Sequence, residues 1–309
     1  MNTSLRRFTP FRFEPVGRCV YCGTSVFDPK RPQLRLSTEH IVPEGIGGNH
    51  LLPEASCHDC GTITSSFELT VQRKAFGPIR YHLRLPTKRP KNRPEVLPFT
   101  LIDADGTRRS IDVPVGEYPL MIALARMSPP RILAPPTDGD RQIDIIAPNG
   151  TDFVDAQIAK LANEHGAVSG SLEMGVGAGD LRLALAKIAH CYAVARFRKK
   201  GFQPFLADLI RRKDEEGLKL FVGAALEPAQ REEVLHFIDV KYVRRGRQKL
   251  IVFTIALFGR YGTPSYDIVV GRLNDNFPAL PKIDGNYQTE PIVWYDPKHP
   301  PPPQQAILM

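Results

Sequence analysis

Two Cys-x-x-Cys pairs near the N-terminus decide the predicted fold: Cys19-Val-Tyr-Cys22 and Cys57-His-Asp-Cys60. Each such turn directs both of its sulfur atoms toward one centre, so four thiolates can close a tetrahedral zinc site. The N-terminal residues 1–7 lack the apolar core of a secretory signal, and we therefore expect a reducing, cytoplasmic environment. In that environment paired cysteines favour metal binding over disulfides.

The residues between the two pairs carry chemistry as well as structure. They include Ser37-Thr-Glu39-His40-Ile-Val-Pro43 and then Gly47-Gly48-Asn49-His50. The alternation at 34–36 predicts a short strand, and residues 39–42 end that strand or begin its partner. A glycine-rich loop follows, and residues 57–76 are predicted to form a helix that ends at Gly77-Pro78. The expected order is strand, loop, strand, helix.

These residues resemble the HNH nucleases of the His-Me finger superfamily. The resemblance covers about residues 15–85, and it depends on Glu39-His40, on Gly47-Gly48-Asn49 and on the two flanking cysteine pairs in the family's order. It implies a zinc-stapled ββα-metal finger that hydrolyses phosphodiester bonds with the help of a divalent ion such as Mg²⁺. It further implies that His40 is the general base, that Glu39 is a ligand of the catalytic ion and that Asn49 orients the base. Cys19, Cys22, Cys57 and Cys60 then match the structural zinc ligands.

The chemistry can be followed without the family. A histidine titrates near neutral pH and can take a proton from water, while a divalent ion stabilises the developing oxyanion. Glu39 and His40 are neighbours, however, and on a regular strand their side chains point to opposite faces. A bend at this position is needed to direct both at one phosphate.

The chain departs from the family pattern at one ligand. The last metal ligand of the family, His or Asn, usually follows the second cysteine of the second pair, and Gly61 stands there. His58 lies three residues before it on nearly the same helical face and could supply the missing imidazole. The other possible substitutes are Asp59, Thr62 and Glu68.

Simpler roles remain open for the same residues. His40 could merely hydrogen-bond a loop, Glu39 could pair with Arg35, and Asn49 suits a turn after two glycines. His50 is expected in an exposed loop. Cys191 lies in an apolar helical run and is expected to be a buried small side chain.

The charge distribution suits a polyanionic partner. The net charge is +8, and residues 1–95 hold 15 Lys and Arg against 8 Asp and Glu, so most of the excess lies with the cysteine module. We expect the partner to be nucleic acid, DNA in the first instance, with phosphate contacts from Arg73, Lys74 and Arg80. No apolar run is long enough for a membrane span. The sequence does not indicate a protein partner.

The rest of the chain predicts a mixed α+β region. We divide the sequence into a basic arm at 1–14, the finger at 15–85, a proline-rich basic linker at 86–98, an α+β domain at 99–295 and a proline-rich tail at 296–309. A hairpin is expected around Asp103-Ala-Asp-Gly106, helices at 153–165, 180–200 and 202–212, and strands at 142–146, 218–222, 234–243, 249–258 and 265–270. Arg244-Arg-Gly-Arg247 is interpreted as a turn.

The sequence therefore predicts a metal-dependent HNH-type endonuclease that cleaves DNA. The alternative is a catalytically inactive, zinc-stapled nucleic-acid-binding protein, and Gly61 is its best argument.

Overall fold

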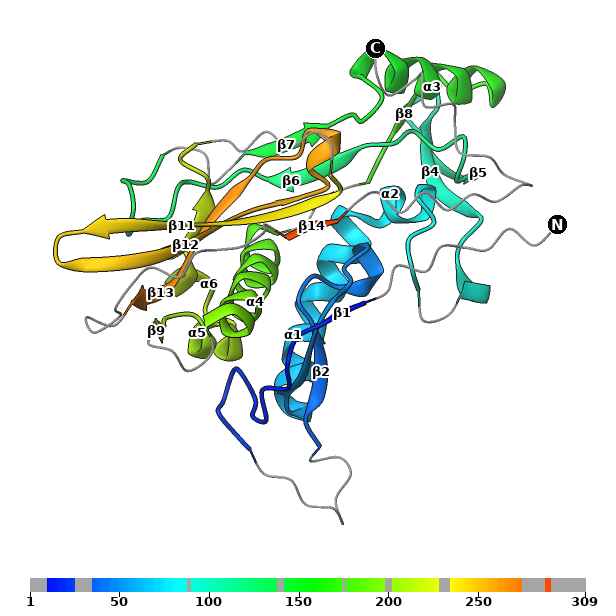
Figure 1. Ribbon diagram of the computed structural model, residues 1–309. Coiled ribbons are helices and arrows are strands. Elements are labelled where there is room, and N and C mark those ends of the chain that lie inside the picture. Colours follow the sequence, from blue (N-terminus) through cyan, green and yellow to red (C-terminus); the bar gives the residue numbers. More distant parts are fainter. Residues whose placement is uncertain are drawn as a thin grey trace.

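The computed structural model describes residues 10–25, 35–87, 90–137, 142–173, 175, 177–197, 202–227, 234–273 and 287–289. The predicted tail, the first nine residues of the predicted arm and residues 88 and 89 of the predicted linker lie outside these ranges, as does Leu34 of the first predicted strand. The predicted mixed α+β class is confirmed. Figure 1 shows the elements along the chain.

The N-terminal module is a small sheet followed by a helix. Strand β2 (Ser37–His40) pairs antiparallel with β3 (His50–Ser56), and the short β1 (Phe11–Arg12) lies parallel to β3 on its other side. The loop between β2 and β3 contains a 3-10 turn, η2 (Glu44–Ile46). Its close packing requires glycine at position 48, where a Cβ atom would lie 2.0 Å from the carbonyl oxygen of Val42. Helix α1 (His58–Thr70) follows, so the observed order is strand, loop, strand, helix, with the second strand at residues for which the sequence predicts none.

The helical segment continues further than predicted. A π-helical turn, η3 (Val71–Ala75), extends α1, and a new helix α2 (Gly77–His82) begins where the sequence predicts a stop. Proline is tolerated in the first turn of a helix because the amide groups there have no intrahelical acceptor. Gly77-Pro78 therefore starts α2. The position at which the sequence predicts the end of a helix is a boundary between two helical segments.

A second, smaller layer contains the predicted hairpin. Strands β4 (Val96–Ile102) and β5 (Arg108–Pro114) pair antiparallel around the turn at Gly106, and β8 (Ser169–Ser171) pairs with the other edge of β4. A short 3-10 turn, η4 (Pro90–Asn92), precedes β4, and α3 (Thr151–Glu164) contacts β8. This layer has its own small core around Phe99, Leu101 and Leu161.

The largest sheet has six strands. Its order is β10 (Val222–Ala224), β13 (Tyr266–Leu273), β12 (Gln248–Leu257), β11 (His236–Arg245) and β14 (Tyr287–Thr289), with β9 (Phe202–Pro204) also on β13. The turn η6 (Gly259–Tyr261) follows β12, and a separate ribbon pairs β6 (Ile122–Ala125) with β7 (Ile143–Ile146). The pattern at 202–212 forms a strand and then α5 (Ala207–Arg212), not one helix. The stretch 218–222 is likewise not one strand, because α6 (Glu215–Leu218) ends at its first residue and β10 begins at its last.

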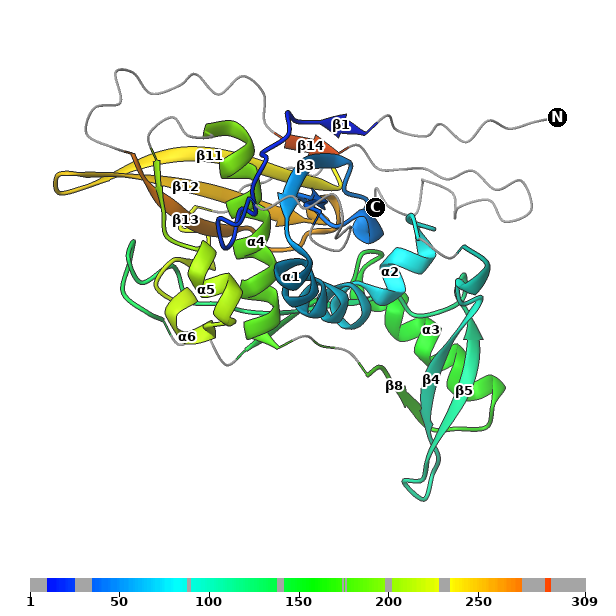
Figure 2. The same ribbon diagram turned by 90° about the horizontal axis from the view of Figure 1, so that it is seen from below.

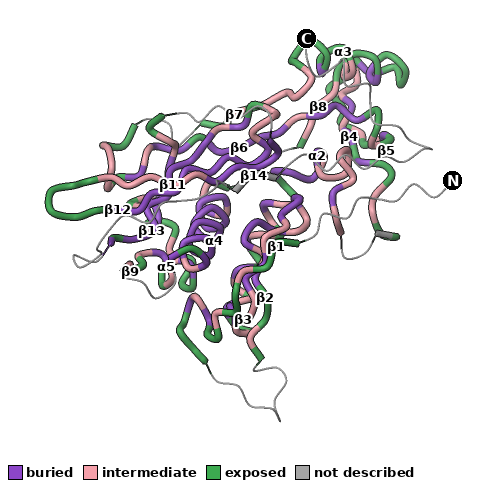
Figure 3. The backbone as a smooth tube through the Cα atoms, in the orientation of Figure 1, coloured by how far each residue is buried: buried purple, intermediate pink, exposed green. Residues whose placement is uncertain are grey.

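Helix α4 (Ala178–Phe197) joins the N-terminal module to the large sheet. It is buried on nearly all sides, which fits its largely apolar sequence. It contacts α1 on one side and β10, β12 and β13 on another (Figure 2). One hydrophobic core runs through these elements, from Ile41 and Phe67 to Ile188 and Phe253. The burial colouring of Figure 3 shows α4 at the centre of this core.

Candidate functional site

The four paired cysteines converge at the start of α1. Cys19 and Cys22 lie in a turn before β2, Cys57 precedes the first residue of α1, and Cys60 is in its first turn. All four Sγ atoms lie within 4.8 Å of one another, and those of Cys22 and Cys57 are 3.7 Å apart. A tetrahedral zinc site with Zn–S bonds near 2.3 Å requires sulfur atoms about 3.8 Å apart. The predicted four-cysteine metal site is therefore supported by its geometry.

The electrostatics of these thiols also suit a metal ion. Burial raises the pKa of Cys19 and of Cys60. Burial acts in the same direction on Cys22, but hydrogen bonds from Thr24 and neighbouring thiols lower its pKa to about 7. Thiolates bind zinc, so the cluster would exchange its protons for one divalent ion. The five cysteines form no disulfide with one another.

Glu39, the predicted ligand of the catalytic ion, points into the protein interior. The residue is only 7% exposed. One carboxylate oxygen, Oε2, lies 3.1 Å from Nζ of Lys187 on α4, and the other accepts a hydrogen bond of 3.2 Å from the Tyr21 hydroxyl. The Tyr21 hydroxyl is in turn 3.2 Å from Sγ of Cys191. The sequence suggested Arg35 as a possible cation for Glu39, whereas the cation that the structure places beside Glu39 is Lys187.

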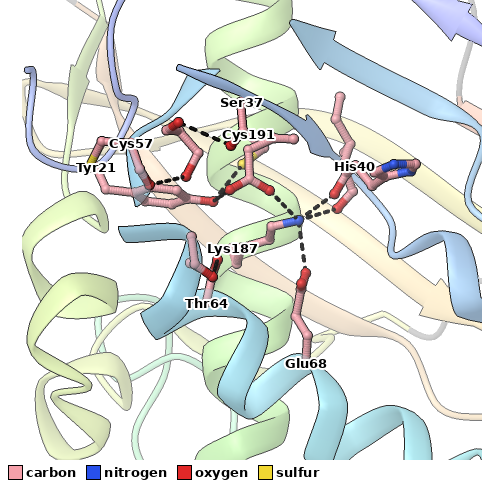
Figure 4. Close-up of polar contacts among 12 residues, drawn as sticks. Tyr21, Ser37, His40, Cys57, Thr64, Glu68, Lys187 and Cys191 are labelled. Atoms are coloured by element: carbon pink, nitrogen blue, oxygen red, sulfur yellow. Dashed lines mark hydrogen bonds and ion pairs between the residues drawn. The ribbon is translucent and has the colours of Figure 1, made fainter. Parts of the chain in front are cut away.

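Lys187 holds a second carboxylate as well. Its Nζ lies 2.8 Å from Oε1 of Glu68 on α1, and it donates to the backbone carbonyl oxygens of His40 and Ile41 (Figure 4). The lysine side chain is only 1% exposed. We refer to Tyr21, Glu39, Glu68, Lys187 and Cys191 as the buried ion cluster.

The ionisation of this cluster follows from burial and from pairing. Burial alone would lower the pKa of Lys187, but the two carboxylates outweigh it and raise the pKa, so the lysine is a cation. Burial raises the pKa of Glu68, and Lys187 counteracts only part of that effect. Burial also raises the pKa of Tyr21, and that of Cys191 to about 12, so both are protonated. Four oxygen atoms surround the ammonium group, two from carboxylates and two from backbone carbonyls. Hard metal ions also prefer oxygen ligands.

His40 does not share this cluster through its ring. Glu39 faces Leu52 and His40 faces Leu51 in the regular ladder between β2 and β3, and the irregularity in the ladder lies earlier, between Ser37 and Glu39. Neighbours on a regular strand point to opposite faces. Figure 4 accordingly shows the imidazole of His40 directed away from the Lys187 amino group. The bend that would direct Glu39 and His40 at one phosphate is not found at this position.

Asn49 and His50 form their own contact. Oδ1 of Asn49 lies 3.0 Å from Nδ1 of His50. His50 is the first residue of β3 rather than part of an exposed loop, and its ring lies 5.0 Å from Phe11 and 5.7 Å from Phe13 between centroids. Burial, with a smaller contribution from Arg196, lowers the pKa of His50 to about 4. It is therefore neutral at physiological pH.

The candidates for a second metal ligand separate in the structure. His58 and Asp59 are exposed at the start of α1, and Thr62 is exposed one turn later. Glu68 is the candidate that lies beside Glu39, with Lys187 between them. Gly61 and Glu68 are seven residues apart, so they lie on nearly the same helical face.

The three predicted phosphate-binding residues also differ in their surroundings. Arg73 and Lys74 are exposed on the π-helical turn. Arg80 is half-buried, and its guanidinium donates to the carbonyl oxygens of Gly45 and Gln72. Arg80 therefore joins the loop before β3 to α2, while Arg73 and Lys74 can reach a partner.

Sequence reasoning missed Lys187, Tyr21 and the structural role of His190. The sequence does contain a signal for the helix residues. Lys187, His190 and Cys191 are polar or ionisable residues at positions i, i+3 and i+4 of a mostly apolar run, so they lie on one face of the helix. Nε2 of His190 lies 2.9 Å from the carbonyl oxygen of Val20, beside the first cysteine turn. The polar stripe of α4 therefore faces the N-terminal module.

Comparison of the chain with protein-family models, with curated proteins and with solved structures found no match. None of the helices within the described ranges combines the length and the apolar character of a membrane-spanning segment.

Proposed function

We propose that this chain is a zinc-stapled nucleic-acid-binding protein whose finger does not use a catalytic metal ion at Glu39. The observation that carries the proposal is the position of Lys187, whose Nζ lies 3.1 Å from Glu39 and 2.8 Å from Glu68. A divalent ion on the same carboxylates would be close to this ammonium. For an assumed separation of about 4 Å and an effective dielectric constant near 20, the repulsion between them is on the order of 8 kcal/mol.

Two further observations support the absence of a catalytic ion. Gly61 offers no ligand at the position where the family has His or Asn. Glu39 is buried, and its other oxygen accepts the hydrogen bond from Tyr21. A phosphate group would need direct access to an ion at this site, and α4 covers it.

Binding to nucleic acid is supported by charge. The excess of basic residues lies in the first 95 residues, and Arg73 and Lys74 expose their side chains at the end of α1. Basic side chains on one module favour phosphate contacts, whose strength depends on salt.

A metal-dependent DNA endonuclease is the second candidate. It is favoured by the order of β2, β3 and α1 around the four-cysteine cluster, with His40 at the end of β2. In this candidate His40 is the general base, Asn49 positions it, and Glu39 with Glu68 or His58 binds Mg²⁺. It requires α4 to withdraw Lys187 from the buried ion cluster.

The two candidates are separated by a plasmid assay combined with a binding assay. Zinc-loaded protein is incubated with supercoiled plasmid and Mg²⁺ or Mn²⁺, and binding to a labelled DNA duplex is followed by fluorescence anisotropy. We compare wild type with His40→Ala, and with His165→Ala as a matched control, since His165 is exposed at the end of α3.

We expect all three proteins to bind the DNA duplex at low salt, and none of them to nick the plasmid in the presence of Mg²⁺ or Mn²⁺. Nicking that is lost in His40→Ala and kept in His165→Ala would instead establish the endonuclease. Failure of the wild type to bind DNA or RNA at low salt would overturn the proposed nucleic-acid partner.

A further inference from the structure

The tip of the β11–β12 hairpin projects beyond the sheet that supports it. The two strands pair along their full length, from His236 with Leu257 to Arg245 with Gln248. Strand β13 pairs with β12 only as far as Leu250, and β14 pairs with β11 only at its first three residues. The segment Arg244–Lys249 is therefore a two-stranded ribbon without a neighbour strand among the described residues. Figure 1 shows it extending away from the body of the protein.

This hairpin tip is basic and solvent-exposed. Arg244, Arg245, Arg247 and Lys249 are all exposed. The sequence contains no acidic residue between Asp239 and Asp267. Asp267 is itself buried and paired with Lys241. Within the described part of the chain, none of the four tip cations lies within ion-pair distance of a carboxylate.

Several exposed arginines elsewhere in the protein are paired with carboxylates, unlike the four cations of the hairpin tip. Arg126 lies against Asp144, Arg131 is 2.9 Å from Glu216, and Arg211 is 2.7 Å from Asp208. A solvated basic surface serving only solubility would not need four unpaired charges at one projecting turn. The concentration of charge at the tip favours an anionic partner.

The charges of the hairpin tip lie on both faces of the ribbon. Arg244 is directly opposite Lys249 and shares its face, whereas Arg245 is opposite Gln248 on the other face. A flat anionic membrane would contact one face, and the tip has no exposed apolar side chain to insert. A groove with phosphates on both walls would contact both faces. The major groove of B-form DNA is about 12 Å wide and admits a two-stranded ribbon.

We propose that the hairpin tip, Arg244–Lys249, binds the phosphate backbone of a nucleic-acid duplex, with B-form DNA preferred over RNA. The preference follows because the major groove of an RNA duplex is too deep and narrow for a ribbon. The inference rests on the proposed function, that this chain binds nucleic acid, and adds a second contact region remote in sequence from the finger. Arg244 and Lys249 contact one wall of the groove and Arg245 the other.

The test neutralises the hairpin tip and measures binding against salt concentration. The variant is Arg244→Gln, Arg245→Gln, Arg247→Gln and Lys249→Gln combined. We expect its Kd for a labelled DNA duplex at low salt to rise by about tenfold or more. The slope of log K against log salt should become shallower by about 3 to 4, because each lost phosphate contact removes about 0.9 from it.

A matched control carries the same change of net charge in cations that are already paired. It combines Arg126→Gln, Arg131→Gln, Lys160→Gln and Arg211→Gln. Circular dichroism and the zinc content verify that both variants fold. We expect the control to keep a salt slope within about 1 of the wild type, since it removes no phosphate contact.

Several outcomes would overturn the inference. An unchanged salt slope in the tip variant would do so while leaving the proposed function intact, provided that Arg73→Gln with Lys74→Gln still weakens binding. Equal weakening in the control would show that only net charge matters. Loss of binding to phosphatidylserine vesicles without loss of DNA binding would assign the tip to membranes. A wild type that binds no nucleic acid would overturn both the inference and the proposed function.

Discussion

Replacing Lys187 by methionine would leave two carboxylates in the protein interior without their cation. Methionine keeps the length and most of the volume of the lysine chain, so the change removes charge rather than packing. Glu39 and Glu68 would then face each other with the Tyr21 hydroxyl as the remaining donor to Glu39. Removing one partner from a buried ion pair costs about 3–5 kcal/mol. That loss is a large part of the stability of an ordinary domain, roughly 5–15 kcal/mol.

Urea unfolding at constant zinc concentration measures this loss. The matched control is Lys160→Met, because Lys160 is exposed and lies 3.7 Å from Glu164 in a surface pair. Such a pair contributes at most about 1 kcal/mol. A rescue variant combines Lys187→Met with Glu39→Gln and Glu68→Gln, which removes all three charges. We expect it to recover most of the lost stability, since neutral replacements of a buried ion cluster are often tolerated.

The pH dependence gives an independent check on the cause. Burial raises the folded-state pKa of the Glu68 carboxyl group above its unfolded value near 4.3, and without Lys187 the charge that counteracts this effect is gone. The destabilisation is then complete above the folded-state pKa and is relieved as pH falls, because the folded protein takes up protons first. The stability difference between wild type and Lys187→Met should therefore shrink between pH 8 and pH 5. A loss below about 1 kcal/mol at pH 8, or one that does not change with pH, would refute the buried ion cluster.

Two further predictions concern the zinc site and a buried histidine. We expect one zinc ion per chain in the wild type and in Cys191→Ser but none in Cys60→Ser, because Cys191 contacts Tyr21 and is not one of the four clustered sulfurs. Metal analysis of the purified proteins decides, and equal zinc contents in the three proteins would contradict the four-cysteine site. Burial lowers the pKa of His236 to about 4 from a usual value near 6.5. Its neutral ring therefore contributes stability above pH 6.5 that is lost as pH falls toward 4, about 2 kcal/mol of it between pH 7 and pH 5. His236→Gln should show a correspondingly weaker pH dependence in urea unfolding over that interval, and an unchanged dependence would show that the ring is accessible to protons.

Local sequence patterns predicted much of the fold. The two Cys-x-x-Cys turns converge, the hairpin at Asp103-Gly106 forms, and the apolar run that begins near Asp180 is a long buried helix. Alternation placed β11, β12 and β13 within a few residues of their observed ends. These features depend on a few neighbouring residues, so short stretches of sequence carry the information.

The incorrect secondary-structure predictions lie where one sequence pattern is compatible with two local structures. Gly77-Pro78 can end one helix or open the next, and the packing of Phe76 and Ile79 in the core favours the second. The stretch 202–212 begins with a strand because its first residues pair with the edge of β13. The residue propensities of a segment do not show whether the fold brings another strand beside it, so this pairing could not be predicted locally.

The role of Glu39 was decided by the tertiary structure alone. Its place in a short strand and before a histidine is visible in the sequence, and so is the resemblance that implies a metal-ligand role. Its cation, Lys187, lies on a helix far along the chain, and the cluster closes only when α4 packs against α1. A carboxylate acts according to the charge that the fold brings within a few ångströms, because electrostatic interactions depend on distance in space and not on distance along the chain. The sequence by itself therefore determined the four-cysteine cluster and most of the elements, whereas only the folded protein determined which cation the buried acid holds.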